Sequence, residues 1–282
     1  MRFVTYEADR GPRAGVLRGD AVHDVWNGLG EEPPAPSLGA VLRAGRLEEA
    51  GRGGGDGSGV PLADVRLLPP VTDPQKIVCI GLNYASHAAE AGIDPPATPT
   101  FFAKWPNALA APGAEVALPP YSRRVDYEAE VALVIGRRAR DVSEAAAEDH
   151  IAGYTLLNDL SARDYQFMTP QWMPGKVFDG AAPCGPALVT PDEAGAHDAI
   201  GVELTLNGTT MQQATTADLI HSVPVLVAYL SKLMTLEPGD IVSTGTPAGV
   251  GSTREPRVWL AAGDEVVVSS PTLGRLETRL VG

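Results

Sequence analysis

The feature that most constrains the fold of this 282-residue chain is a pair of glutamates, Glu128 and Glu130, followed directly by the apolar run Val131–Ile135. An apolar run of this length that ends at a glycine, here Gly136, predicts a strand buried on both faces. Side chains alternate along a strand, so the two glutamates point the same way, with Cα atoms roughly 6–7 Å apart. Carboxylates aimed together at the edge of a core repel each other and lose hydration, so they need a cation. An all-oxygen ligand set favours Mg²⁺, Mn²⁺ or Ca²⁺.

A different interpretation places both glutamates on the solvated half of an edge strand, paired to Arg123 and Arg124. The local pattern leaves both interpretations open. A third carboxylate, Asp159, lies at the end of the apolar strand predicted at Ile151–Leu157. An isolated Asp in that position is most often a turn or cap residue. The order of these acidic residues along the chain nevertheless favours a metal site.

Composition and charge exclude several classes of partner. The chain is 44% hydrophobic and 20% charged, which is typical of a globular protein. A formal net charge of −13 predicts no general attraction to nucleic acid or to anionic membranes. The N-terminal residues lack the apolar segment of a signal peptide. Cys79 and Cys184 lack the spacing of zinc ligands. We therefore expect a cytoplasmic protein with reduced, buried cysteines.

Strand signals outnumber helix signals along the chain, which predicts a strand-dominated α+β fold. Asn207-Gly208, after an alternating segment, predicts a hairpin, and Ser222 with Pro224 predicts the start of a helix over Val223–Met234. Shorter helices are expected near Leu38–Ala50, over Asn83–Ala91, and from a cap at Asp141 or Ser143 through Ala147. The glycine-rich segment 51–59 predicts a linker inside a small N-terminal domain, residues 1–68, which precedes a main domain over residues 69–282.

From Lys76 to the C-terminus the chain resembles the fumarylacetoacetate hydrolase family. The resemblance rests on six segments in the right order: Gly81–Glu90, Phe101–Lys104, Asp126–Glu130, Asn158–Asp164, Gln171–Lys176 and Thr244–Gly251. It implies a mixed β-sandwich or β-roll catalytic domain with a small N-terminal α/β domain. It also implies a homodimer that acts on a small 2-oxo acid.

The resemblance implies that Glu128, Glu130 and Asp159 bind one Mg²⁺ or Mn²⁺, with Ca²⁺ as a possible substitute. A divalent metal in this position stabilises the enolate of a 2-oxo acid. Lys176 would add positive charge beside that enolate. A lone lysine is more commonly a solvated surface charge, but its setting between Trp172 and Phe178 favours the functional role.

The resemblance implies that three further residues bind the substrate. Arg163 and Gln166 lie three apart in a segment that can be helical, so they can share a face. An ion pair of Arg163 with Asp164 or Asp159 is the structural alternative. Thr246 and nearby backbone N–H groups would hold the substrate carboxylate, as exposed backbone donors do. A plain turn is the alternative for this loop, which lacks the Gly-Lys-Ser/Thr of a nucleotide-binding loop.

His87 and Glu90 lie three apart on the helix expected after Gly81, so they can meet on one face. A carboxylate beside an imidazole orients it and raises its basicity, which suits the activation of water. The resemblance assigns that task to such a pair in hydrolytic family members. Gly81 and Gly92 bracket the segment and are consistent with a lid or with simple turns.

The main functional hypothesis is a divalent-metal-dependent hydrolase that cleaves the C–C bond of 2,4-dioxo acids (acylpyruvates) through a metal-stabilised pyruvate enolate. An oxaloacetate-type decarboxylase or a 2-hydroxy-dienoate isomerase would use the same site, and fold alone does not separate these reactions. A non-enzymatic protein with a structural Ca²⁺ is a third possibility. The cationic residues expected around the acids argue against it, because a structural ion needs none.

Overall fold

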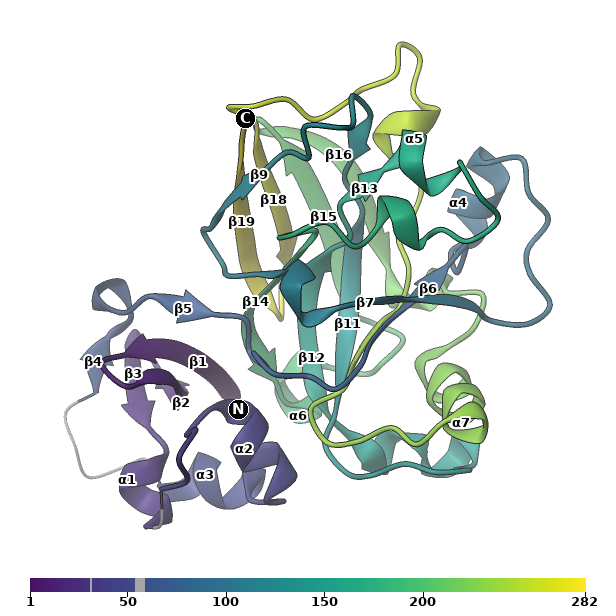
Figure 1. Ribbon diagram of the computed structural model, residues 1–282. Helices are drawn as coiled ribbons and strands as arrows, with labels where there is room; N and C mark the ends of the chain where they lie inside the picture. The colour runs from purple at the N-terminus through teal and green to yellow at the C-terminus, as the bar shows by residue number, and fades with distance from the viewer. Residues whose placement is uncertain (31, 54–58) are drawn as a thin grey trace.

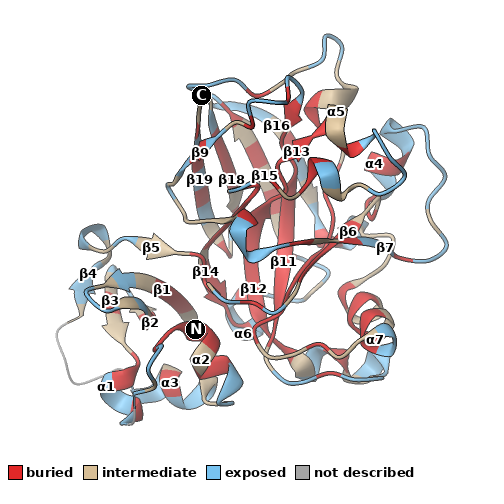
Figure 2. Cartoon of the chain, in the orientation of Figure 1, coloured by how far each residue is buried: buried red, intermediate tan, exposed pale blue. Residues whose placement is uncertain are grey.

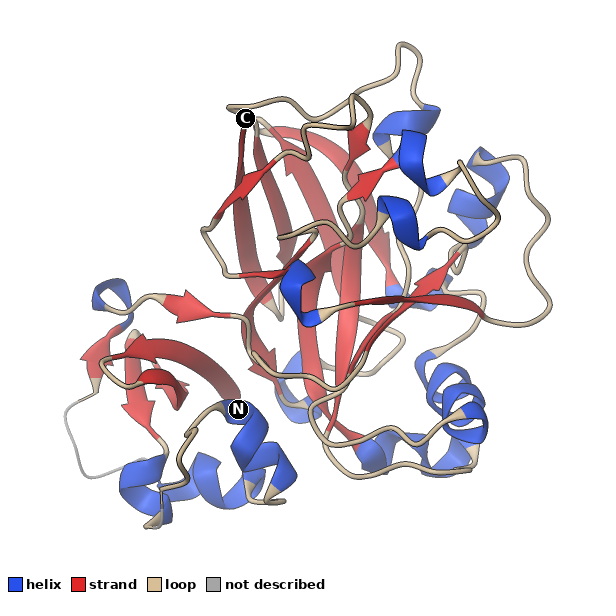
Figure 3. Cartoon of the chain, in the orientation of Figure 1, coloured by secondary structure: helices blue, strands red, loops and turns tan. Residues whose placement is uncertain are grey.

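The structure is a computed structural model that describes residues 1–30, 32–53 and 59–282. Two β-sheets dominate it (Figures 1 and 3). The larger sheet has the order β4-β3-β2-β1-β14-β12-β11-β17-β6-β7, with β5 beside β1 and β8 beside β14. Its strands are β1 (Arg2–Ala8), β2 (Gly11–Arg18), β3 (Ala21–Asp24), β4 (Val60–Pro61), β5 (Leu67–Leu68), β6 (Ile77–Gly81), β7 (Thr100–Lys104), β8 (Leu109–Ala110), β11 (Ala129–Ile135), β12 (Ile151–Asn158), β14 (Ala182–Val189) and β17 (Ile241–Ser243).

The second sheet packs against the middle of the first, where β15, β18 and β19 contact β11, β12 and β14. Its order is β16 (Thr209–Thr215), β15 (Gly201–Leu206), β18 (Glu265–Ser270), β19 (Gly274–Val281) and β9 (Glu115–Ala117). A separate short ladder joins β10 (Val125–Asp126) to β13 (Ser161–Ala162). The prediction of a strand-dominated α+β fold with a sandwich-like catalytic domain is confirmed.

The central strands β11 and β12 are buried along their whole length (Figure 2). Each lies between two other strands of the larger sheet, and one face is covered by the second sheet. The two strands have no solvated face, which explains the unbroken apolar run Val131–Ile135 within β11.

Helices are short and lie at the margins of the sheets (Figure 3). They are α1 (Trp26–Leu29), α2 (Leu38–Arg43), α3 (Leu47–Gly53), α4 (Ala85–Glu90), α5 (Arg163–Gln166), α6 (Pro191–Ala194) and α7 (Val223–Leu233). Turns of 3₁₀ helix occupy Leu62–Asp64, Pro106–Ala108, Glu144–His150, Met173–Gly175, Thr216–Asp218 and Gly251–Thr253. No helix in the described part of the chain is long and apolar enough to cross a bilayer.

Several local predictions are confirmed. Asn207 and Gly208 both have positive φ, 50° and 78°, and join β15 to β16, as expected for a two-residue hairpin turn. Helix α7 begins at Val223 with Pro224 in its first turn. The helix expected after Ser143 is a 3₁₀ helix instead, and the Ser143 side chain makes no capping hydrogen bond.

The segment near residues 38–50 forms two helices, and the expected linker at 51–59 is partly wrong. Helix α3 continues to Gly53, while residues 54–58 lie outside the described residues. The glycines in α3 allow close packing. A Cβ on Gly51 would lie 2.1 Å from Met1 Sδ, and a Cβ on Gly28 of α1 would lie 2.3 Å from Gly53 O. Residue type alone does not distinguish such glycines from those of a flexible linker.

The N-terminal segment, residues 1–68, continues the larger sheet. Strand β1 pairs with β14 through Arg2 opposite Val189 and Phe3 opposite Leu188. Strand β5 also pairs with β1, immediately before the predicted boundary at residue 68. That boundary stays a prediction, since backbone hydrogen bonds join the two parts.

Candidate active site

The three candidate metal ligands meet at one end of β11 and β12. Asp159 directly follows β12, and its N–H donates to Glu128 O at 2.9 Å. Glu130 lies opposite Leu157 in the antiparallel ladder. Glu128, Glu130 and Asp159 each offer a carboxylate oxygen within 4.8 Å of the others, and all three are buried. Antiparallel pairing therefore brings together residues that lie about thirty positions apart.

The edge-strand interpretation of the glutamates is wrong. Glu128 pairs with Lys176 and Arg163, and neither Arg123 nor Arg124 contacts it through an ion pair. The distances are 2.7 Å from Lys176 Nζ to Glu128 Oε2 and 2.6 Å from Arg163 Nη2 to Glu128 Oε1. Burial raises the pKa of Glu128, but these two cations outweigh it and leave that pKa lowered. Glu128 is therefore ionised on the floor of the site.

Glu130 differs from Glu128 because it forms no ion pair with any described residue. Its Oε2 accepts hydrogen bonds from Ser243 Oγ and from Gly245 N, the latter at 3.0 Å. Burial, together with the neighbouring charges of Asp159 and Glu128, raises the pKa of Glu130 to about 8. Without a further cation, this carboxyl group is therefore mostly protonated near neutral pH, and a bound cation would favour its ionised form.

The charge balance of the buried cluster supports a divalent cation. The cluster contains four acids and three bases, so with every group ionised its formal charge is 3 − 4 = −1: Asp126, Glu128, Glu130 and Asp159 against Lys104, Arg163 and Lys176. Three buried carboxylates with close oxygens form the hard donor set that Mg²⁺ and Mn²⁺ prefer. Glu128, Glu130 and Asp159 would hold such an ion, and Glu130 would gain its missing partner.

Lys104 is a buried member of the cluster whose role was not predicted from the sequence. Its Nζ lies 2.8 Å from Asp159 Oδ1 and donates to the carbonyl oxygens of Leu160, Lys176 and Ala181. Lys176 Nζ holds the other oxygen of Asp159 at 2.8 Å. The sequence signal that could have identified Lys104 is the alternation of side chains along β7. Phe102 and Lys104 share one face of this strand and are buried, whereas Phe101 is exposed.

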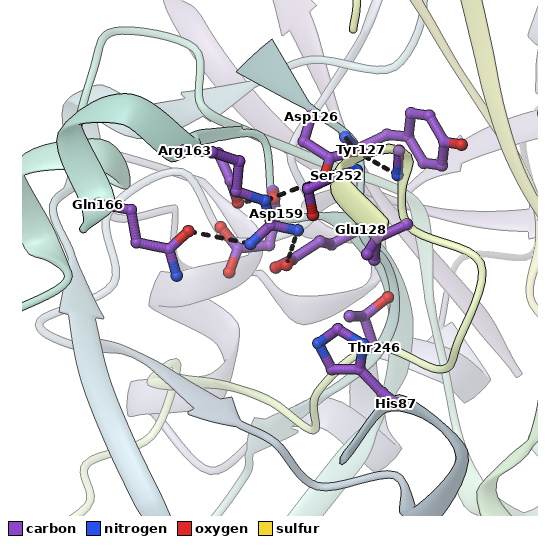
Figure 4. A network of polar contacts seen from close by, with 12 residues as sticks. His87, Asp126, Tyr127, Glu128, Asp159, Arg163, Gln166, Thr246 and Ser252 are labelled. Atoms are coloured by element: carbon purple, nitrogen blue, oxygen red, sulfur yellow. Dashed lines mark hydrogen bonds and ion pairs between the residues drawn. The ribbon is translucent and has the colours of Figure 1, made fainter. Parts of the chain in front are cut away.

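Arg163 and Gln166 share one face of α5, as predicted, and Arg163 Nη1 donates to Gln166 Oε1 at 2.9 Å (Figure 4). The expected alternative ion pair with Asp164 or Asp159 is wrong. Arg163 Nε instead donates to Asp126 Oδ2 at 2.9 Å. Asp126 also accepts from Gly251 N and Ser252 N, at 2.7 and 3.0 Å. It therefore connects Arg163 to the loop that follows β17.

Thr246 lies in that loop, but its hydroxyl is already engaged by the protein. It donates to Ala129 O at 3.0 Å and accepts from Gln212 Nε2 at 2.8 Å. Gln212 also bonds to Ala129 N and Pro247 O, so it fixes the loop against β11. Gln212 lies on β16 without a recognisable motif, so its role was not predictable from the sequence. Backbone donors of the loop are the better candidates for contact with substrate.

His87 and Glu90 meet on α4 as predicted, with Nδ1 of His87 3.3 Å from Oε2 of Glu90. Glu90 also accepts from Gly249 N at 3.0 Å, which fastens α4 to the loop after β17. Burial raises the pKa of Glu90, but hydrogen bonds from His87, Thr253 and Gly249 leave it lowered. In Figure 4 the His87 ring lies beside Thr246, on the side of Glu128.

The glycines that bracket α4 have different functions. Gly92 has φ +66° and lies just beyond the end of α4, a conformation that glycine adopts without strain. A Cβ on Gly81 would lie 2.2 Å from the Trp172 ring, so Gly81 permits close contact with that side chain. The lid remains a prediction.

One cavity of about 360 Å³ contains the metal-ligand candidates and most other predicted site residues. Of the nine predicted site residues, only Glu90 does not line this cavity. Apolar side chains form much of the remainder, and Lys176 Nζ lies 4.9 Å from the Phe102 ring centroid. Arg124 and Arg257 also line the cavity. This arrangement can bind an anionic molecule with oxygen ligands at one end and place an imidazole beside it.

Comparison with known proteins identifies relatives of this chain. The model of the fumarylacetoacetate (FAA) hydrolase C-terminal family matches residues 76–281. The mitochondrial oxaloacetate tautomerase fahd2 of Xenopus laevis is 40% identical over 221 residues, which cover 78% of this chain and 69% of that protein.

Two solved structures are similar over the whole chain. A putative HpcE protein from Mycobacterium smegmatis is 33% identical with a TM-score of 0.90, and the match covers 100% of this chain and 99% of that one. Maleylpyruvate hydrolase from Sphingobium sp. SYK-6 is 31% identical with a TM-score of 0.81 and the same coverage.

Proposed function

The chain belongs to the fumarylacetoacetate hydrolase family, and from this we propose that it is a Mg²⁺- or Mn²⁺-dependent enzyme that interconverts the enol and keto forms of a 2-oxo acid. The bound metal would stabilise the enolate oxygen as a Lewis acid. Glu128, Glu130 and Asp159 would hold that metal. Lys176, between Glu128 and Asp159, adds positive charge where the enolate forms.

The observation that carries this proposal is the position of the His87 imidazole in the wall of the cavity that contains the carboxylates. Nδ1 of His87 faces Glu90, so Nε2 is the nitrogen available to substrate. In the keto-to-enol direction, Nε2 accepts a proton from C3 of the 2-oxo acid, and the electron pair of the broken C–H bond becomes the C2–C3 double bond. The π pair of the C2=O bond moves to the 2-oxygen, which takes a proton from water to give the enol. The reverse step returns the proton to C3. Similarity to an oxaloacetate tautomerase supports this assignment.

The test is proton exchange at C3. Metal-free protein is given Mg²⁺ or Mn²⁺ in D₂O with 2-oxobutanoate or acetylpyruvate, and loss of the C3 proton signal is followed by NMR. We expect metal-dependent exchange well above the rate with metal and buffer alone. Exchange no faster than that background would reject the proposal.

His87→Ala is expected to slow C3 exchange by about 10²–10⁴-fold, the usual contribution of a general base. The rise in melting temperature on addition of metal should be unchanged, because His87 is not a proposed ligand. The matched control is His197→Ala, which removes a histidine paired to Glu148 at the surface. Unchanged exchange in His87→Ala would show that another group transfers the proton.

Hydrolysis of an acylpyruvate is the second candidate, because an imidazole oriented by Glu90 can also activate water. Similarity to a maleylpyruvate hydrolase supports it. Acetylpyruvate in H₂¹⁸O separates the two reactions. Label in released acetate would establish hydrolysis, whereas C3 exchange without cleavage would establish tautomerisation alone. Release of pyruvate from oxaloacetate that survives in His87→Ala would identify decarboxylation, which needs no base. The homodimer and the cytoplasmic location stay predictions.

A further inference from the structure

Two arginines in the cavity wall have no partner in the described part of the chain. Arg124 and Arg257 both line the cavity and both are exposed. Within the described ranges, neither guanidinium group makes a hydrogen bond or an ion pair. The other cations of the site are engaged, since Arg163 contacts Asp126 and Glu128 and Lys176 contacts Glu128 and Asp159. The cavity thus contains two positive groups that its own acids do not neutralise.

The backbones that carry these arginines are held in place beside the site. Arg163 N donates to Arg124 O at 2.9 Å, next to the short ladder of β10 and β13. Val258 N donates to Gly251 O at 3.0 Å, and Leu260 N donates to Val125 O at 2.9 Å. The segment after Arg257 therefore runs beside the segment after Arg124. The two backbones are thus fixed beside the cavity, and their unpaired guanidinium groups are of the type that binds planar anions bidentately.

The acids that line the cavity are buried and the two arginines are exposed, so they lie at different depths of the cavity. Its floor is the buried carboxylate cluster with Lys176 and Arg163, whereas its wall includes the apolar side chains of Ile80, Ile93, Phe102, Phe167, Trp172 and Trp259. A volume of about 360 Å³ lies at the lower end of the range for drug-sized ligands, so it has room for more than a four-carbon acid. Among the arginines and lysines that line the cavity, Arg124 and Arg257 are the two without an ion pair to a described residue, so they are the charged partners open to a second carboxylate of a bound 2-oxo acid.

We propose that Arg124 and Arg257 bind the distal carboxylate of an extended 2-oxo diacid whose 2-oxo acid end lies at the metal site. The assignment of the 2-oxo acid end rests on the proposed function above. The two arginines select for the second carboxylate and for chain length, and they take no part in proton transfer.

The test compares two six-carbon probes that differ only at the distal end, 2-oxoadipate with a carboxylate and 2-oxohexanoate with a methyl group. Calorimetry with Mg²⁺-loaded protein measures binding, and C3 exchange in D₂O measures turnover. Wild-type protein should bind 2-oxoadipate at least about tenfold more tightly, the usual effect of a charge-assisted pair. In Arg124→Met and Arg257→Met that preference should shrink, and in the double variant it should disappear. Constants for 2-oxohexanoate should not change.

Arg123→Met is the matched control. Arg123 is also an exposed arginine, next in sequence to Arg124, but it does not line the cavity. Its replacement should leave the preference for 2-oxoadipate intact. A loss equal to that in Arg124→Met would mean that general surface charge attracts the diacid, and the inference would fail.

The two readouts separate this inference from the proposed function. Exchange on both probes without an arginine-dependent preference would overturn the inference and leave the function standing. An arginine-dependent preference in binding without any exchange would support the subsite and overturn the function. Absence of both binding and exchange would overturn both.

Discussion

Glu130→Gln is expected to abolish metal-dependent turnover, with a loss of at least about a hundredfold, and to remove the stabilisation of the protein by Mg²⁺ or Mn²⁺. Glutamine keeps an acceptor for Ser243 Oγ and Gly245 N, so the local hydrogen bonds survive. It removes the one carboxylate of the site that forms no ion pair with a described residue. Metal-free Glu130→Gln should therefore be at least as stable as metal-free wild-type protein.

The measurement is thermal unfolding of metal-free protein with increasing Mg²⁺ or Mn²⁺, alongside the C3 exchange assay. In wild-type protein, metal at about a hundred times its Kd should add about 2.7 kcal/mol to the free energy of unfolding. Glu265→Gln is the control, since Glu265 is exposed on β18 and does not line the cavity. A normal metal response in Glu130→Gln would contradict the ligand assignment.

The pH dependence of metal-free protein offers a related test. The pKa of Glu130 is raised to about 8 in the folded state, from about 4.5 when exposed. Between these values the folded state binds more protons than the unfolded state, so stability contributed by this group falls as pH rises. That fall should be present in metal-free wild-type protein and absent from metal-free Glu130→Gln. If the free energy of unfolding depended on pH equally in both proteins, Glu130 would not be the group whose pKa is raised in the folded state.

Lys104→Met is expected to lower the free energy of unfolding by about 3–5 kcal/mol, because it breaks a buried ion pair and leaves its carboxylate partially unpaired. Lys104 is fully buried and contacts Asp159 Oδ1 together with three carbonyl oxygens. Without it, Asp159 is held by Lys176 on one oxygen only. Urea unfolding of metal-free protein measures the loss, and metal affinity should fall as Asp159 becomes free to rotate.

Lys76→Met is the matched control. Lys76 Nζ lies 2.7 Å from Asp240, but Lys76 is partly exposed, and Asp240 also accepts hydrogen bonds from the backbone N–H groups of Lys76 and Glu237. Its loss should cost about 1 kcal/mol or less and leave metal affinity unchanged. A loss in Lys104→Met no larger than in Lys76→Met would show that Lys104 does not hold the site.

Much of the fold of residues 69–282 was predictable because its signals are local. The apolar run of β11, the turn at Asn207 and Gly208, and the proline near the start of α7 each depend on a few adjacent residues. The pairing of His87 with Glu90 and of Arg163 with Gln166 also follows from spacing on a single helix. Prediction failed where a residue's partner lies far away in sequence, as for the glycines of α3, which pack against Met1 and α1.

The sequence by itself determined the strand-dominated fold class, the family, and the residue types that can hold a divalent metal, because these depend on local pattern and ordered motifs. Only the tertiary structure decided which charges neutralise one another. Lys104, Arg163 and Lys176 come from a strand, a helix and the end of a 3₁₀ turn, and the tertiary fold brings them to Asp159 and Glu128. It also left Glu130 without an ion pair among the described residues, and Arg124 and Arg257 free in the cavity wall. Electrostatic compensation depends on distance and burial, and spacing along the chain encodes neither.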